Sequence, residues 1–217
     1  KINGISVTAP KGATILEAAR LAGIEIPTLC YLKELNQIGA CRICLVEIQG
    51  ARGLQASCSY PVSEGLVVRT NTKEVLEARK ATLELILSNH KKNCLSCSRN
   101  TDCELQALAE KMQVGDVIYE GTAEDEIDDL STSIVRDNSK CILCRRCVAT
   151  CSNVQNINAI AVANRGFESH IATANDRSLA DVNCTYCGQC IQACPVGALK
   201  EKDETKNVFR KLRDKDA

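Results

Sequence analysis

The chain has 217 residues, and its 27 basic and 27 acidic side chains give a formal net charge of zero. It has 15 cysteines, no tryptophan and only 3% aromatic residues, so we expect small modules with little aromatic core. No stretch approaches 18 apolar residues, which excludes a membrane span, and residues 1–10 do not have the pattern of a signal peptide.

Residues 1–70 predict a small β-rich domain with one helix. Its elements are an Asn-Gly hairpin within 1–9, a helix that opens with a capping box at Thr14–Glu17 and ends near Ala22, and strands at 44–48 and 66–70. This order indicates a β-grasp arrangement. Residues 71–115 predict a helical module, because Leu83, Leu87 and His90 share one face of a helix over 71–90. A second short helix is expected from about Cys103.

The remaining chain divides by charge and by cysteine content. Residues 116–138 are acidic, and we interpret them as a solvated linker. Residues 139–200 hold eight cysteines in a ferredoxin-like unit with an inserted hairpin at 159–172. Residues 201–217 form a charged connector, and we expect a larger protein to continue beyond Ala217. The predicted fold class is therefore α+β, in three metal-stapled modules.

All 15 cysteines fall into groups of close spacing once one histidine is added. In chain order the groups are Cys30, Cys41, Cys44 and Cys58; His90, Cys94, Cys97 and Cys103; Cys141, Cys144, Cys147 and Cys151; and Cys184, Cys187, Cys190 and Cys194. An iron–sulfur cluster takes four protein ligands, so these side chains predict four clusters and leave no cysteine for another metal.

Three interpretations of the cysteines compete. A disulfide framework is typical of small secreted proteins, and the odd number of cysteines argues against it. Structural zinc sites use separated C-x2-C pairs, whereas this chain carries C-x2-C-x2-C-x3-C twice, the spacing of [4Fe–4S] ferredoxins. We therefore rank iron–sulfur above zinc and zinc above disulfides. Such clusters favour a reducing compartment, so we expect a cytoplasmic location.

The two C-x2-C-x2-C-x3-C runs predict two [4Fe–4S] clusters. In two-cluster ferredoxins the fourth cysteine of each run ligates the other cluster. By that rule the third ligand set is Cys141, Cys144, Cys147 and Cys194, and the fourth ligand set is Cys151, Cys184, Cys187 and Cys190. Pro195 follows Cys194 directly and completes the ferredoxin signature.

The first and second ligand sets are the groups that begin at Cys30 and His90. The first, C-x10-C-x2-C-x13-C, shares its central C-x2-C with plant-type ferredoxins and predicts a [2Fe–2S] cluster on an irregular loop. The second, H-x3-C-x2-C-x5-C, predicts a [4Fe–4S] cluster held by one histidine and three cysteines, with a zinc ion on the same ligands as its rival. A neutral imidazole removes one negative charge, so this cluster should be easier to reduce. His170 has no cysteine neighbours and is assigned no role.

Bound clusters change the charge of the protein. Four thiolates outweigh an oxidised cluster core, and the four sites together add roughly −7. The loaded chain should therefore be acidic, which argues against nucleic acid as a partner. Arg42, Arg145 and Arg146 lie between ligands, where they either offset cluster charge or are ordinary surface charges. The sequence leaves both interpretations open.

This order of modules resembles the N-terminal relay of [FeFe]-hydrogenases over essentially the whole chain. The segments CILCRRC at 141–147, NRGF at 164–167 and DVNCTYCGQC at 181–190 look most like the catalytic subunit of multimeric, NAD(P)-linked and often electron-bifurcating hydrogenases. The family's active-site domain, which holds the H-cluster, is missing from these residues, so we expect it beyond Ala217. No catalytic residue is assigned within the chain.

The resemblance implies an electron relay within an oxidoreductase that acts on H2. Single electrons would pass between an NAD(P)H- and flavin-binding diaphorase-type subunit, or a soluble ferredoxin, and the H2-converting site. A small [2Fe–2S] subunit is a further implied partner in a hetero-oligomer. NAD-linked formate dehydrogenases and the large iron–sulfur subunit of complex I share the first modules, and the formate enzymes are the stronger alternative. A zinc-stabilised scaffold is the alternative without redox chemistry.

Overall fold

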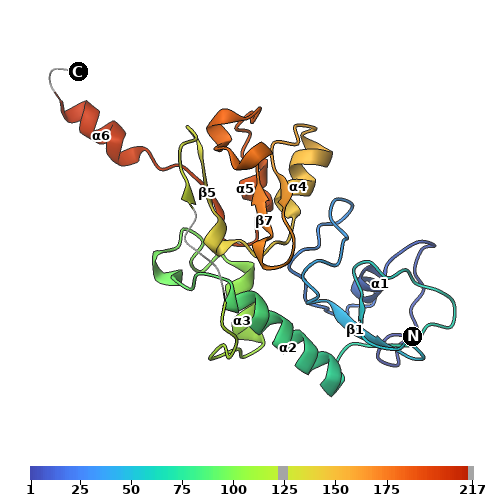
Figure 1. Cartoon of the computed structure of the whole chain (residues 1–217). Coiled ribbons are helices and arrows are strands. Elements are labelled where there is room, and N and C mark those ends of the chain that lie inside the picture. The colour runs from blue at the N-terminus through green and yellow to red at the C-terminus, as the bar shows by residue number, and fades with distance from the viewer. Residues whose placement is uncertain (122–126, 215–217) are drawn as a thin grey trace.

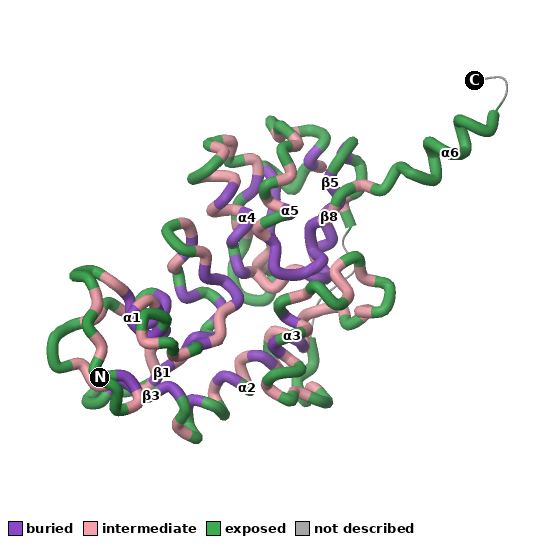
Figure 2. The backbone as a smooth tube through the Cα atoms, turned by 180° about the vertical axis from the view of Figure 1, so that it is seen from behind, coloured by how far each residue is buried: buried purple, intermediate pink, exposed green. Residues whose placement is uncertain are grey.

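The computed structural model describes residues 1–121 and 127–214. Figure 1 shows the N-terminal region at one end of the molecule, a long helix α2 (Lys73–Ser88) leading away from it, and the region around α4 and α5 beyond. The last helix, α6 (Thr205–Arg213), projects from the body and is exposed along its length (Figure 2). None of the described helices is long and apolar enough to cross a bilayer.

The N-terminal region combines one helix with a small antiparallel sheet in the order β2-β1-β3. Its elements are α1 (Ile15–Leu21), β1 (Leu45–Ile48), β2 (Gln55–Ala56) and β3 (Val68–Arg69). The capping box is confirmed, because the Thr14 hydroxyl accepts from the Glu17 amide and the Glu17 carboxylate accepts from the Thr14 amide at 2.7 Å. Ile2 adds a parallel bridge to Val68, so the start of the chain joins the sheet.

The helical module follows the prediction closely. Helix α2 begins after Thr72, whose hydroxyl accepts from the Val75 amide, and it buries Val75, Arg79, Leu83 and Leu87 on one face. A short 3-10 turn, η1 (Cys94–Ser96), and helix α3 (Glu104–Lys111) come next. The predicted second helix near Cys103 is therefore confirmed.

The third region contains a sheet in the order β4-β5-β8 and a separate hairpin, β6-β7. The strands are β4 (Ile127–Asp128), β5 (Ile134–Asp137), β6 (Ala161–Ala163), β7 (His170–Ala172) and β8 (Leu199–Glu201). The helices are α4 (Arg146–Ala149) and α5 (Gln189–Ala193), with a π-helical turn η3 (Thr150–Val154) and 3-10 turns η2 (Asn138–Lys140), η4 (Gly166–Glu168), η5 (Ala174–Asp176) and η6 (Leu179–Asp181). The predicted hairpin at 159–172 is confirmed by β6 and β7.

The acidic segment 116–138 is more than a linker. Its central residues 122–126 lie outside the described part of the chain. Strands β4 and β5 fall within it, and β5 pairs with β8 across the ferredoxin-like region. Asp128 is also tied down, because its carboxylate accepts from the Ser178 hydroxyl at 2.7 Å and the Leu179 amide at 2.9 Å. The ferredoxin-like sheet therefore begins before residue 139.

Two apolar cores organise the chain. The first is formed by the sheet and helix of the N-terminal region, including Ile15, Leu16 and Val46. The second runs from α2 and α3 into the ferredoxin-like region, and it also takes in Leu29, Cys30, Cys41 and Ile43 from the N-terminal region. The cysteine loop of the first domain is therefore packed into the core that also contains the four cysteines of the third set.

Candidate metal centres

The first ligand set is fully enclosed. Cys30, Cys41, Cys44 and Cys58 are each at most 6% exposed. The Cys30 sulfur lies within hydrogen-bonding distance of the sulfurs of Cys41 and Cys58, and these bonds lower the pKa of Cys30 while raising those of its two donors. A further bond from Cys58 lowers the pKa of Cys44 to about 6. Four sulfurs thus converge, and some already favour the thiolate form that iron requires.

The loop that carries Cys41 and Cys44 is irregular, as its sequence predicts. Glu34, Gly39 and Arg42 all have positive φ angles, of 63°, 63° and 56°. At Gly39 an added Cβ would lie 3.3 Å from the Cβ of Ala56, so a side chain there would meet both backbone strain and crowding. The chain changes direction at these three residues, so the sulfurs of Cys41 and Cys44 face the same buried site.

The third ligand set surrounds an apolar cavity. Cys141, Cys144, Cys147 and Cys194 all line it, so the cysteine of the second run joins three cysteines of the first. Burial raises the pKa of Cys141 to about 11 and that of Cys144 to about 12, and the charge of Cys194 acts on both in the same direction. Iron binding would therefore have to displace protons from these buried thiols.

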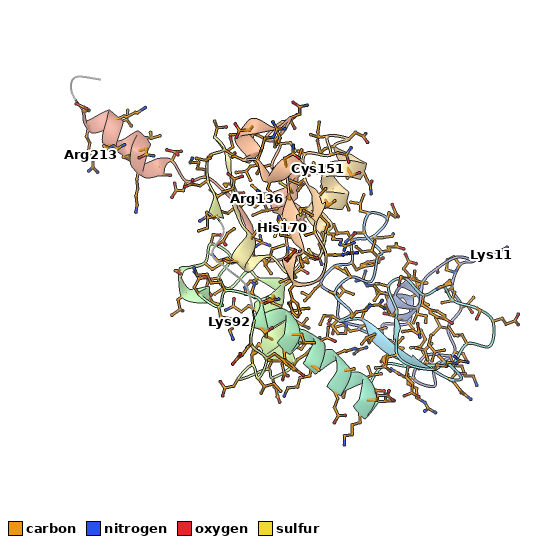
Figure 3. The ribbon with its side chains drawn as sticks, in the orientation of Figure 1. Lys11, Lys92, Arg136, Cys151, His170 and Arg213 are labelled. Atoms are coloured by element: carbon orange, nitrogen blue, oxygen red, sulfur yellow. The ribbon has the colours of Figure 1, made fainter. Side chains whose placement is uncertain are left out.

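The fourth ligand set lines a second apolar cavity. Cys151, Cys184, Cys187 and Cys190 border it, and the charges of the other three act on Cys190, whose pKa burial raises to about 11. Cys151 comes from the π-helical turn η3 and is labelled in Figure 3. The set is less enclosed than the others, because Cys187 is exposed. The charge of Cys190 also raises the pKa of Cys147 in the third set, so the two sets are neighbours.

The second ligand set is only half-buried. Cys94, Cys97 and Cys103 are partly exposed, and the charges of Cys97 and Cys94 add to the burial that raises the pKa of Cys103. His90 lies just beyond α2, where its Nδ1 is 3.0 Å from the carbonyl oxygen of Lys140, and burial lowers its pKa. Burial favours the neutral ring, and the hydrogen bond places the proton on Nδ1, which leaves Nε2 available as a ligand atom. Ligation by His90 remains a prediction.

The donor sets suit multi-iron clusters. In the part of the chain that the structure describes, no three His, Cys, Asp or Glu side chains meet closely enough to hold a single metal ion. Around the two apolar cavities, however, four thiols border each space, and a cluster spreads its ligands over several iron atoms. His170 bonds Asp176 and the Glu168 carbonyl through its two ring nitrogens.

Three buried arginines lie beside the ligands. Arg136, labelled in Figure 3, lines the cavity of the third set and donates to the Ile171 carbonyl at 2.9 Å. Arg146 is buried and forms a bidentate pair with Glu104 at 2.6 and 2.8 Å, so a surface role for it is wrong. Arg42 and Arg145 are exposed, and Arg145 also lines the cavity of the third set. The sequence analysis missed Arg79, although it interrupts the apolar face of α2 at i, i+4 spacing.

Contacts between the modules converge on the third ligand set. A Cβ added to Gly197 would lie 2.5 Å from the Cys97 sulfur, and Arg99 donates to the Cys194 carbonyl at 3.2 Å. From the N-terminal region, the Asn36 side chain reaches the Cys144 carbonyl at 2.9 Å. Residues next to the first and second sets therefore contact backbone carbonyls of the third set, and the charge of Cys190 of the fourth set acts on Cys147, so the third set lies between the others.

These features define an iron–sulfur protein. Three family models match it in succession: a 2Fe-2S iron-sulfur cluster binding domain at residues 1–73, the NADH-ubiquinone oxidoreductase-G iron-sulfur binding region at 79–117, and the ferredoxin-like domain of NADH-quinone oxidoreductase subunit 3 at 131–200. The chain thus has one [2Fe–2S] domain followed by [4Fe–4S]-binding domains.

Individual relatives sharpen that assignment. The chain is 44% identical to the NADP-reducing hydrogenase subunit HndD of Solidesulfovibrio fructosivorans over 99% of its length, and 37% identical to the NADPH-Fe(3+) oxidoreductase subunit alpha of Geobacter sulfurreducens over 93%. It spans only 38% and 24% of these two relatives. A chain in the crystal structure of an NAD+-reducing [NiFe]-hydrogenase matches with a TM-score of 0.86 and 32% identity, covering 93% of this chain and 86% of that one.

The chain belongs to the family of iron–sulfur electron-transfer subunits found in NAD(P)-linked hydrogenases and complex I-like enzymes. More narrowly, it corresponds to the N-terminal iron–sulfur region of the HndD-like subunit of NAD(P)-reducing hydrogenases. The resemblance inferred from the sequence is confirmed at this level.

Proposed function

We propose that this chain carries single electrons through four iron–sulfur clusters held by the four ligand sets. The observation that supports this most strongly is the pair of apolar cavities, each lined by four cysteines drawn from both ferredoxin runs. When bound, each cluster takes up and gives back one electron. The first set would hold a [2Fe–2S] cluster and the others [4Fe–4S] clusters, with His90 completing the second.

The chain's own residues would insulate these sites and set their potentials. Burial of the first and third sets excludes water, which lowers the reorganisation that accompanies a change of charge. Arg79 supplies buried positive charge beside the first set, which favours the reduced state there. Arg136 and Arg146 lie beside the third set, where Asp128 and Glu104 offset part of their charge. The central place of the third set gives electrons from the first and second sets a common acceptor.

We further propose that the electrons serve an [FeFe]-hydrogenase. Similarity to the subunit named NADP-reducing hydrogenase supports hydrogen chemistry, and the CILCRRC and DVNCTYCGQC segments support the [FeFe] type. The chain spans 38% of that relative, and the H2-converting domain would belong to the part of the subunit that it does not cover. An NAD(P)H- and flavin-binding subunit, a small [2Fe–2S] subunit or a soluble ferredoxin would exchange electrons with the clusters. The relatives do not favour the formate dehydrogenase alternative. A reducing compartment such as the cytoplasm suits these sites.

A relay subunit of an NAD+-reducing [NiFe]-hydrogenase is the second candidate. It is supported by the structural match that covers 86% of a chain from such an enzyme. The two candidates differ in the metal of the hydrogen site. Nickel in the purified native complex would support the second candidate, and H-cluster signals in its infrared spectrum would support the first.

The relay itself is tested by metal analysis. Chain purified without oxygen should be brown and contain about 14 iron atoms with matching sulfide, and stepwise reduction should produce paramagnetic signals of both cluster types. Stoichiometric zinc in place of iron, or no signals on reduction, would contradict the proposal.

A further inference from the structure

Asn36 is a buried side chain at the boundary between the first and third ligand sets. It is 3% exposed and closes a tight loop, because its backbone N–H donates to the Leu32 carbonyl at 2.9 Å and its carbonyl accepts from the Leu32 amide at 3.0 Å. Glu34 at the tip of this loop has a φ of 63°. These backbone hydrogen bonds therefore position Asn36 independently of the contacts that its side chain makes.

The side-chain amide of Asn36 connects two cysteines that belong to different sets. Its Nδ2 donates to the Cys30 carbonyl at 2.7 Å and to the Cys144 carbonyl at 2.9 Å. An amide nitrogen has two hydrogens, so both are used on these acceptors. The cysteines are far apart in sequence and lie in separate domains, yet a single nitrogen atom joins their backbones.

We propose that Asn36 is the positioning residue that couples the cluster of the first set to the cluster of the third set. Its two hydrogen bonds hold the ligand loops in fixed register, and they complete a short route from the Cys30 sulfur to the Cys144 sulfur. In the step, one electron leaves the reduced [2Fe–2S] cluster and enters the oxidised [4Fe–4S] cluster. No bond forms or breaks and no proton moves. This inference rests on the proposed function, because it requires clusters at both sets.

Other contacts between the domains do not replace this one. Arg79 joins α2 to the Leu45 carbonyl, and Lys111 pairs with Glu25 at the surface, but neither reaches the third set. The Asn36 side chain, in contrast, touches the backbone of a ligand on each side. Both carbonyls are buried with their residues, so removing the amide leaves them without this donor.

The test replaces Asn36 in the full-length protein. Asn36→Leu keeps the approximate size and removes both donors, whereas Asn36→Ser keeps one. Asn3→Leu is the control, because Asn3 bonds Thr70 on the far side of the same domain and contacts no ligand. Iron content and the EPR spectrum report whether the clusters are intact. The rate of electron equilibration between the two clusters after flash reduction, and the magnetic broadening between their reduced forms, report the coupling.

The expected result is a full iron content with a several-fold slower equilibration and weaker broadening in Asn36→Leu, an intermediate rate in Asn36→Ser, and wild-type behaviour in Asn3→Leu. A wild-type rate in both Asn36 variants overturns the inference. If Asn36→Leu loses its iron, the rate in Asn36→Ser decides. A wild-type protein without clusters would instead contradict the proposed function, so the two failures are distinct.

Discussion

The first and second ligand sets are built on opposite physical principles. The four cysteines of the first are at most 6% exposed, and the domain around them has an apolar core of its own. The three cysteines of the second are partly exposed, and Leu95 between them is 96% exposed. Between His90 and Cys103 the regular structure is limited to the short turn η1, and no residue of 90–102 belongs to either apolar core. Hydrogen bonds hold this segment, both within its turns and to the third region, as from Arg99 to the Cys194 carbonyl.

The difference indicates two uses of a metal centre. In the first domain, the sheet and helix have a core of their own, so their folding would create the site that a cluster occupies. In the second module, the cluster itself would supply much of the order, as metals do in small domains without a sufficient core. A cluster in the first domain would be shielded from water. A cluster in the second module would lie near the surface, where an electron carrier could reach it.

Removal of one ligand from each set should have the largest effect. Cys94→Ala should lose about four iron atoms and Cys41→Ala about two. Loss of the second cluster should also unfold the segment around 90–103, whereas loss of the first should leave β1 and β3 folded on their own core. Hydrogen exchange measured by mass spectrometry checks both expectations.

The matched result would separate the two designs. Fast exchange at 90–103 in Cys94→Ala, with slow exchange at 45–48 in Cys41→Ala, is the expected pattern. Equal protection of both segments would show that the second module folds without its metal, and the comparison would then fail.

Gly197→Ala should damage the second set from outside its own module. The added Cβ would lie 2.5 Å from the Cys97 sulfur, closer than non-bonded atoms approach. We expect loss or distortion of the second cluster while the first is kept, seen as a change in one component of the EPR spectrum. Gly53→Ala is the control, because an added Cβ there meets nothing within 4 Å. An unchanged spectrum in Gly197→Ala would exclude close packing of the two regions at this point.

Local signals in the sequence were sufficient for much of the fold. The capping box at Thr14, the apolar face of α2 and the hairpin of β6 and β7 depend on neighbouring residues, and all three are confirmed. The spacing of the cysteines likewise indicated the family, because ligand geometry restricts spacing directly. Short strands such as β4 and β8 have only two or three residues, too few for a periodic pattern, and their pairing is decided by the tertiary structure.

The charged and polar residues of the interior were harder to foresee. Arg146 stands beside Arg145 in the sequence, yet one is buried on Glu104 and the other is exposed. Asn36 lies in a loop without any motif, and only the approach of Cys144 from another domain gives its side chain a role between two ligand sets. Such roles depend on which segments meet, and a single sequence does not contain that information in its local pattern.

His90→Cys should lower the potential of the second cluster. A thiolate in place of a neutral imidazole adds one negative charge, and the effect of histidine ligands in Rieske centres indicates a shift on the order of 100 mV. A redox titration followed by EPR measures it. His170→Asn serves as the control, because His170 bonds Glu168 and Asp176 and lies outside the four ligand sets. An unchanged potential in His90→Cys would count against His90 as a ligand.

Arg79→Met should produce the smallest shift, confined to the first set. Arg79 is 4% exposed, and its Nε and Nη2 donate to the Leu45 carbonyl at 3.0 and 2.6 Å, next to Cys44. Burial lowers the pKa of Arg79, and the charge of Cys44 opposes that change, so a reduced cluster is the natural counter-charge. Loss of this cation should lower the potential of the [2Fe–2S] cluster by about 60 mV, a tenfold change in its equilibrium constant. Arg69→Met, which breaks an exposed pair with Glu47 in the same domain, should leave that potential unchanged. Equal potentials in the two variants would mean that a buried charge beside the enclosed cluster shifts its potential no more than an exposed charge does. Burial of the first set would then not strengthen the effect of nearby charges on its cluster.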